Sequence, residues 1–193
     1  MLRRLSSWAF WLWAPLCLLL VASLMVTHTY ALPAPAPQDL RVERDAQGRW
    51  QMLHVLYGRC RCSQRILQHL LTRKALPGVA ERIVLVGADP QLEQRARAAG
   101  FVIEAITPEE LPRRYALNAV PALAVISPAR VEYLGGYTER KQGPEIADLE
   151  IFERVRAGTR TDALPLFGCA VSEALRGRLD PLSLRAWLLG ETR

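Results

Sequence analysis

The segment WQMLHVLYGRCRCSQRILQHLL, residues 50–71, decides the fold of this chain. Its first eight residues are mostly apolar and favour a strand, which Gly58 interrupts. The motif Arg-Cys-Arg-Cys follows at residues 59–62, and the apolar residues behind it recur at the spacing of one helix face. The segment therefore predicts a strand, a short turn with two cysteines, and a helix.

Cys60 occupies the predicted junction between the strand and the helix. Backbone N–H groups without helical partners and the positive end of the helix dipole point toward that position. Arg59 and Arg61 add positive charge on either side of the cysteine. Such surroundings lower a cysteine pKa from about 8.5 to roughly 3.5–7.5. The local pattern is typical of a reactive cysteine, with both arginines as candidate thiolate-stabilising residues.

A second motif, Asn-Ala-Val-Pro-Ala-Leu-Ala-Val at residues 118–125, places Pro121 at the start of an apolar strand. Together the two motifs resemble those of the thioredoxin-like superfamily, and the resemblance covers about residues 49–156. It implies an α/β fold of three layers, a mixed central sheet with helices on both faces. In the family this proline follows a cis peptide bond and exposes backbone groups to a bound substrate strand. Val120 and Pro121 are therefore the candidate substrate-binding residues.

The cysteine spacing departs from the family pattern. Family members usually have two residues between their cysteines, whereas Cys60 and Cys62 are separated by one. The resemblance assigns Cys60 to the attacking cysteine, and Ser63 falls on the position of the resolving cysteine. A disulfide between Cys60 and Cys62 would close a small, strained ring. Cys62 and Cys169 therefore both remain candidates for the thiol that resolves Cys60.

The N-terminal segment indicates export from the cytoplasm. Arg3 and Arg4 precede an apolar stretch, residues 8–30, of the length that crosses a bilayer. The positive-inside rule places the N-terminus in the cytoplasm and the remaining chain in the periplasm, with a single-pass anchor in a bacterial inner membrane. A signal peptide cleaved near residues 29–31 is the alternative.

Residues 1–31 are expected to form this anchor or signal peptide, and the remaining chain divides into three parts. A Pro-rich spacer covers residues 32–40, a thioredoxin-like domain residues 41–158, and a C-terminal extension with Cys169 residues 159–193. The domain is expected to begin with a hairpin over residues 42–57, with its turn at 45–48. Helices are expected at 107–115 and 145–156, and a tail helix at 170–178, which would put Cys169 at another helix start.

The pattern as a whole predicts a thiol-disulfide exchange protein that acts on the thiols or disulfides of protein partners. Its net charge of +6 is mild and shows no basic stripe, which argues against nucleic acid binding. A Cu(I) carrier using the same thiols is one alternative, although His69 lies roughly 10 Å from Cys62 along a helix. A non-catalytic interaction module is another. His54 is expected to be a core or surface histidine, and no cofactor or metal ligand is assigned.

Overall fold

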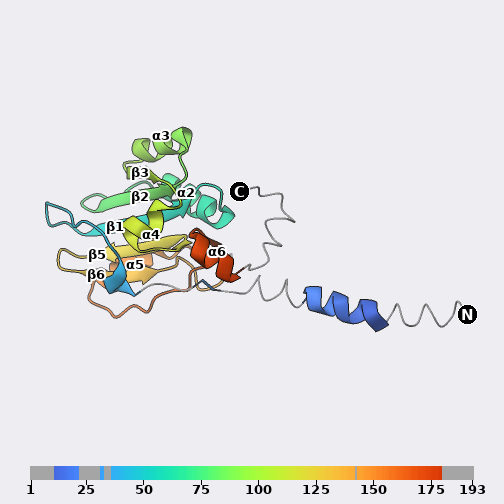
Figure 1. Ribbon diagram of the computed structural model, residues 1–193. Helices are drawn as coiled ribbons and strands as arrows, with labels where there is room; N and C mark the ends of the chain where they lie inside the picture. The colour runs from blue at the N-terminus through green and yellow to red at the C-terminus, as the bar shows by residue number, and fades with distance from the viewer. Residues whose placement is uncertain (1–10, 22–30, 33–35, 142, 180–193) are drawn as a thin grey trace, which may run out of the picture. The chain divides into compact units, whose positions relative to one another are not determined.

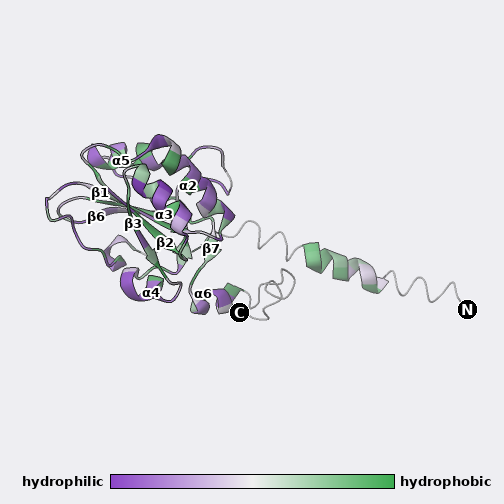
Figure 2. Ribbon diagram, turned by 90° about the horizontal axis from the view of Figure 1, so that it is seen from above, coloured by the Kyte–Doolittle hydropathy of each residue, from purple (hydrophilic) through white to green (hydrophobic). Residues whose placement is uncertain are grey.

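The computed structural model describes residues 11–21, 31–32, 36–141 and 143–179 (Figure 1). The chain divides into two compact units, Met1–Tyr30 and Ala31–Arg193. In the first unit, residues 11–21 form a helix that is hydrophobic along most of its length (Figure 2). Within the described ranges, we find no helix with both the length and the apolar character needed to cross a membrane. The predicted anchor extends over residues 8–30 and thus falls partly outside the described residues.

The second unit is built on a five-stranded mixed sheet with the order β3-β2-β1-β5-β6. The strands are β1 (Gln51–Tyr57), β2 (Ala80–Val86), β3 (Val102–Ile106), β5 (Ala122–Ile126) and β6 (Val131–Gly135). β1, β2 and β3 run parallel to one another, whereas β5 is antiparallel to both β1 and β6. A second, two-stranded sheet joins β4 (Ala119–Val120) to β7 (Cys169–Ala170).

Helices cover both faces of the five-stranded sheet. They are η1 (Pro37–Asp39), α2 (Arg61–Arg73), α3 (Pro90–Ala98), α4 (Glu110–Tyr115), α5 (Asp148–Arg156) and α6 (Glu173–Leu179). Figure 2 shows α2, α3 and α5 on one side of the strands, and α4 and α6 on the other. The predicted three-layer α/β architecture is therefore confirmed, and it fits the thioredoxin-like fold.

The two hydrophobic cores follow from the alternation of side chains along the strands. In β1, Met52 and Leu56 pack toward α2 and α5, whereas Leu53 and Val55 pack toward α4 and α6. All four side chains are almost completely buried. This continuous burial on both faces explains why β1 reads as an apolar run rather than as an alternating pattern.

The predicted hairpin over residues 42–57 is wrong, because only Gln51–Tyr57 forms a strand there. Both edges of β1 are occupied by β2 and β5, so no edge remains for a strand that precedes it. The turn itself exists in another form: the Asp45 carboxylate accepts the backbone N–H groups of Gln47 and Arg49. α4 and α5 also begin three residues later than predicted.

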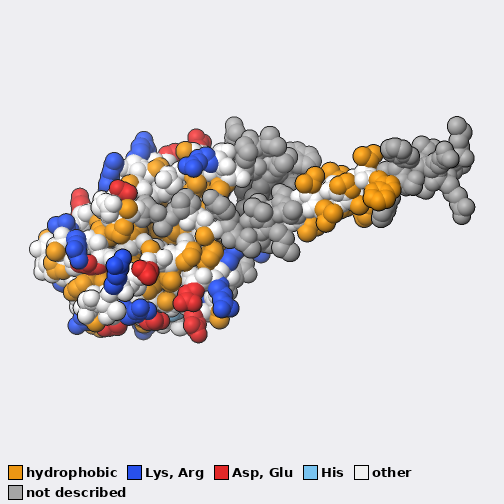
Figure 3. All heavy atoms as spheres, turned by 90° about the horizontal axis from the view of Figure 1, so that it is seen from below, with side chains coloured by type: hydrophobic (Ala, Val, Ile, Leu, Met, Phe, Trp, Pro, Cys, Tyr) orange, Lys and Arg blue, Asp and Glu red, His pale blue; other side chains and the backbone are white. Residues whose placement is uncertain are grey.

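The spacer and the extension are part of the domain's packing rather than separate from it. Leu32 and Leu40 from the spacer are buried in the same core as Leu166, Val171 and Leu175 from the extension. The Leu32 N–H donates to the Leu166 carbonyl over 2.8 Å. The face drawn in Figure 3 carries basic and acidic side chains interspersed with apolar ones.

Candidate active site

Cys60 lies where the sequence pattern predicts it, at the N-cap of α2. A tight turn after β1 brings its backbone N–H to the Tyr57 carbonyl, 2.9 Å away. The Cys60 carbonyl then accepts the first helical hydrogen bond, from Gln64. Only 1% of the Cys60 residue surface is exposed, so the protein and not water determines the ionisation of its thiol.

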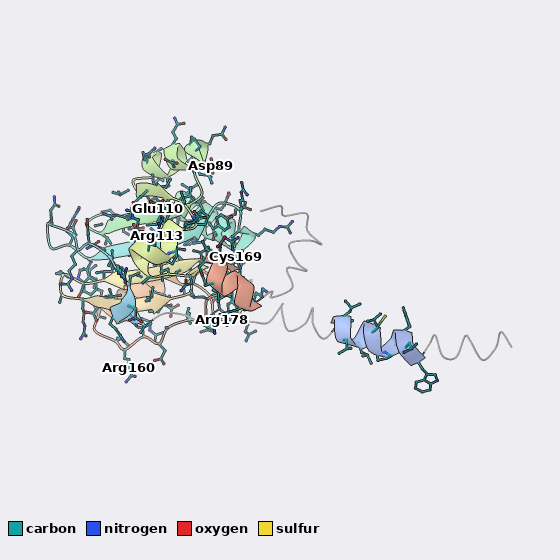
Figure 4. The ribbon with its side chains drawn as sticks, in the orientation of Figure 1. Asp89, Glu110, Arg113, Arg160, Cys169 and Arg178 are labelled. Carbon is teal, nitrogen blue, oxygen red and sulfur yellow. The ribbon has the colours of Figure 1, made fainter. Side chains whose placement is uncertain are left out.

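Cys169 meets Cys60 across 109 residues of sequence. Its Sγ lies 2.7 Å from the Cys60 Sγ, and Figure 4 labels Cys169 close to α6. The structure corrects the expected helix start at this position, because Cys169 belongs to β7, and α6 begins only at Glu173. β7 is antiparallel to β4, with Cys169 opposite Val120. The structure therefore brings Cys169 next to two other predicted site residues, Cys60 and Val120.

The three thiols have unequal roles in the electrostatics of the site. The pKa of Cys60 is well below its ordinary value, first because the Cys169 thiol donates a hydrogen bond to it and second because the Cys62 thiol does. Burial opposes this lowering, and the backbone of Ser63 adds to it. The pKa of Cys62 is raised, first by its hydrogen bond to Cys60 and then by burial. Of the three thiols, Cys60 is therefore the one whose ionisation the site favours, with the other two as hydrogen-bond donors.

Arg59 and Arg61 are exposed, and neither is among the principal causes of the low pKa of Cys60. Hydrogen bonds from sulfur account for the largest part of that lowering. The thiolate-stabilising role of the two arginines stays a prediction. Val120 is buried, and the peptide bond from Val120 to Pro121 is cis, as the resemblance implied. The function of these two residues in binding substrate also stays a prediction.

A cavity of about 340 Å³ opens beside the cysteines. Its lining residues are Arg61, Cys62, Arg65, Ile66, Pro121, Tyr137, Thr138 and Phe167. No motif in the sequence indicates Arg65, Tyr137 or Phe167 as site residues. Arg65 of α2 donates to the carbonyl groups of Gly143 and Pro144, which lie in the loop between β6 and α5. These hydrogen bonds attach that loop to α2. The sequence features that could point to these residues are the glycine pair at 135–136, just before Tyr137, and the run Phe-Gly-Cys at 167–169.

A buried polar network begins at Tyr137 on the cavity wall. Its hydroxyl lies 2.9 Å from His54 Nδ1, and His54 Nε2 lies 3.3 Å from a Glu81 oxygen. Because an ionised carboxylate only accepts, Nε2 carries the proton of a neutral imidazole, and Nδ1 accepts the Tyr137 O–H. Burial lowers the pKa of His54, which keeps it neutral. His54 is thus a core histidine, one of the two positions expected for it from the sequence.

The network continues through Arg73, which links two fully buried carboxylates. Its guanidinium contacts Glu81 and Asp148, each over 2.8 Å, and His69 Nε2 lies 2.9 Å from Asp148. His69 is therefore engaged with a carboxylate on α5. Among the described residues, no three His, Cys, Asp or Glu side chains are grouped so as to hold a metal ion.

No protein-family model and no curated protein matches the chain. Among solved structures, it is similar to a hypothetical protein from Sinorhizobium meliloti, with TM-score 0.50 and 16% identity over 74% of this chain and 96% of that one. An uncharacterized conserved protein from Geobacillus kaustophilus gives TM-score 0.47 and 13% identity over 75% and 90%. A secreted Mycobacterium tuberculosis disulfide oxidoreductase homologous to E. coli DsbE gives 0.40 and 14% over 57% and 82%. At such identities the likeness to the S. meliloti protein concerns the fold alone.

Proposed function

We propose that the chain is a thiol-disulfide oxidoreductase that exchanges disulfides with protein partners, and that Cys60 is its nucleophile. The Cys60 thiolate attacks one sulfur of a partner disulfide. A bond forms between Cys60 and that sulfur, the partner's S–S bond breaks, and the second partner sulfur leaves as a thiolate with the electron pair. The low pKa of Cys60 supports this role, because the thiolate is the reacting form of a cysteine.

Cys169 is the resolving thiol in this proposal. After it loses its proton, its sulfur attacks Cys60 Sγ, forms a disulfide between Cys60 and Cys169, and releases the partner as a thiol. Two partner thiols are gained and two thiols of this chain are oxidised; the same steps in reverse oxidise a partner dithiol. The 2.7 Å separation of the two sulfurs is the observation that carries this assignment.

Cys62 acts on Cys60 through its hydrogen bond rather than by resolving it. Its raised pKa keeps it protonated while Cys60 is the thiolate. A disulfide with Cys60 would also close a ring across a single intervening residue, which is strained. Cys62 is therefore a positioning residue that favours the thiolate at Cys60.

Thiol counting tests this assignment. The full chain, purified in mild detergent, is alkylated with and without reductant, digested, and its cysteine peptides are identified by mass. We expect one reductant-sensitive disulfide joining Cys60 to Cys169, which persists in the Cys62→Ser variant and disappears in Cys169→Ser. A disulfide between Cys60 and Cys62 in the unaltered chain would overturn the role of Cys169 but leave Cys60 as the nucleophile.

We further propose that residues 8–30 anchor the chain in a bacterial inner membrane with the domain in the periplasm. The apolar stretch after Arg3 and Arg4 supports this, together with the oxidising compartment that disulfide exchange requires. Alkaline carbonate extraction of membranes, followed by protease treatment of spheroplasts, is the test. We expect the chain to stay with the membrane and its domain to be digested from outside. Recovery of a shortened, soluble domain would instead indicate a cleaved signal peptide.

A further inference from the structure

Residues 164–171 of the extension cross the candidate active site, with a bend at Gly168 and a two-residue strand at Cys169–Ala170. The Leu164 carbonyl accepts the N–H of Gly136, and the N–H of Val171 donates to the Asn118 carbonyl, each over 2.8 Å. Between these two points, Cys169 and Ala170 pair with β4 as an antiparallel strand. This is the arrangement by which a foreign polypeptide adds a strand to an exposed edge.

The crossing is so close that glycine is required where the segment passes β4. A Cβ atom added to Gly168 would lie 1.9 Å from the Val120 carbonyl oxygen and 2.4 Å from Pro121 Cδ. Gly136 of the domain also lies very close to this segment, since a Cβ atom added to it would lie 2.0 Å from the Pro165 carbonyl oxygen. The residue before a cysteine bound at this edge must therefore lack a side chain.

The segment 164–171 is anchored by two buried side chains, and the residues between them are less buried. Leu166 and Val171 are almost completely buried in the core. Residues 167–170 remain partly exposed, and Phe167 only lines the cavity of about 340 Å³ without filling it. The side chain two residues before the cysteine therefore borders this cavity.

From this geometry, and resting on the proposed function, we infer that the edge of β4 binds extended segments of partner proteins in which glycine directly precedes the reacting cysteine. Residues 164–171 occupy this edge in the structure. A partner segment takes their place while its cysteine reacts with Cys60, and the return of residues 164–171 brings Cys169 back to resolve the mixed disulfide. In the resident segment Cys169 Sγ meets Cys60 Sγ, and in the bound partner the corresponding cysteine does. The substrate class is therefore a Gly-Cys strand with a large apolar residue before the glycine.

A peptide with the sequence of residues 164–171, Leu-Pro-Leu-Phe-Gly-Cys-Ala-Val, is the probe, and a second peptide has alanine in place of its glycine. Each carries its cysteine as a mixed disulfide with nitrothiobenzoate. Attack by the Cys60 thiolate joins Cys60 to the peptide sulfur and releases the nitrothiobenzoate thiolate, whose colour gives the rate. Mass analysis verifies that the peptide is on Cys60.

Two full-length chains are compared, both carrying Cys169→Ser so that the resident thiol does not compete. One adds Gly168→Ala, whose new methyl group collides with β4 and expels the resident segment. The other adds Gly177→Ala, a matched change in the exposed part of α6, where a Cβ meets nothing within 4 Å. We expect the glycine peptide to modify the Gly168→Ala chain at least about tenfold faster than the Gly177→Ala chain, and at least about tenfold faster than the alanine peptide does.

Equal rates for the two peptides would overturn the requirement for glycine before the cysteine. Equal rates for the two chains would overturn the claim that residues 164–171 occupy the partner's binding edge. The small symmetrical disulfide of nitrothiobenzoate separates these results from a failure of the proposed function. If it modifies Cys60 while neither peptide does, the binding site is refuted and the nucleophile stands; if it does not, both are refuted. Should Gly168→Ala unfold, as circular dichroism would show, the Gly177→Ala chain at saturating peptide must still prefer the glycine peptide.

Discussion

Replacing Cys60 by serine is expected to lower the rate of disulfide exchange with a protein disulfide at least about a thousandfold. A hydroxyl at this position is not ionised at neutral pH, and it cannot form the mixed disulfide through which exchange proceeds. The thiols of Cys169 and Cys62 would remain, but the thiolate that they stabilise would be absent. The measurement is the rate at which the full chain reduces a fluorescently labelled protein disulfide, with dithiothreitol as the electron donor.

Cys17→Ser is the matched control, since it makes the same atomic change in the helix at residues 11–21, in the other compact unit. Its exchange rate should equal that of the unaltered chain. The exchange rate of Cys62→Ser should lie between those of Cys60→Ser and Cys17→Ser, because this variant lacks the second of the two thiol donors that lower the pKa of Cys60. Exchange by Cys60→Ser at the rate of the unaltered chain would move the nucleophile to another cysteine and contradict the proposal.

The part of the site that could be predicted from the sequence is the part made by neighbouring residues. Gly58 ends β1, and the helical spacing of Ile66, Leu67 and Leu70 begins α2, so the position of Cys60 at their junction follows from local pattern alone. The apolar strand after Pro121 could be predicted for the same reason. Each of these features is encoded within a few residues of where it occurs.

The surroundings of Cys169 could not be predicted, because a strand of two residues has no periodicity to detect. Cys169–Ala170 is a strand only because β4 offers its edge, and that pairing joins parts of the chain about 50 residues apart. The same limit applies to the hairpin expected before β1. Its sequence pattern is compatible with a strand, but the partners of β1 come from residues 80–86 and 122–126.

The buried polar network beneath the site could not be predicted from the sequence either. Its charged residues come from α2, β2 and α5, which are far apart along the chain. The side chains of Glu81 and Asp148 are completely buried, and both carboxylates form an ion pair with Arg73, whose side chain is 10% exposed. The network reaches the cavity wall through His54 and Tyr137. It therefore connects the packing of α2 and α5 to the residues that line the site.

Replacing Arg73 by methionine is expected to lower the free energy of unfolding by about 3–5 kcal/mol at neutral pH. Methionine fills similar volume but leaves two buried carboxylates without their cation, and an uncompensated buried charge is costly. Arg97→Met is the matched control, because Arg97 is 59% exposed and forms only a surface pair with Glu93. Its effect should be no more than about 1 kcal/mol. Urea unfolding of the full chain, followed by circular dichroism, gives both values.

The pH dependence of this loss identifies its cause. In the unaltered chain, hydrogen bonds from His54 and Arg73 outweigh burial and lower the pKa of Glu81 from 4.5 to about 2. That contribution to stability is fully present above pH 4.5 and is lost as the pH falls toward 2. Without Arg73 the pKa of Glu81 rises, so the carboxyl can be protonated and its burial costs less. The difference between Arg73→Met and the unaltered chain should therefore shrink as the pH is lowered from 7 through 4.5. A difference that stays constant over this range would mean that lost packing, and not the buried charges, accounts for the destabilisation.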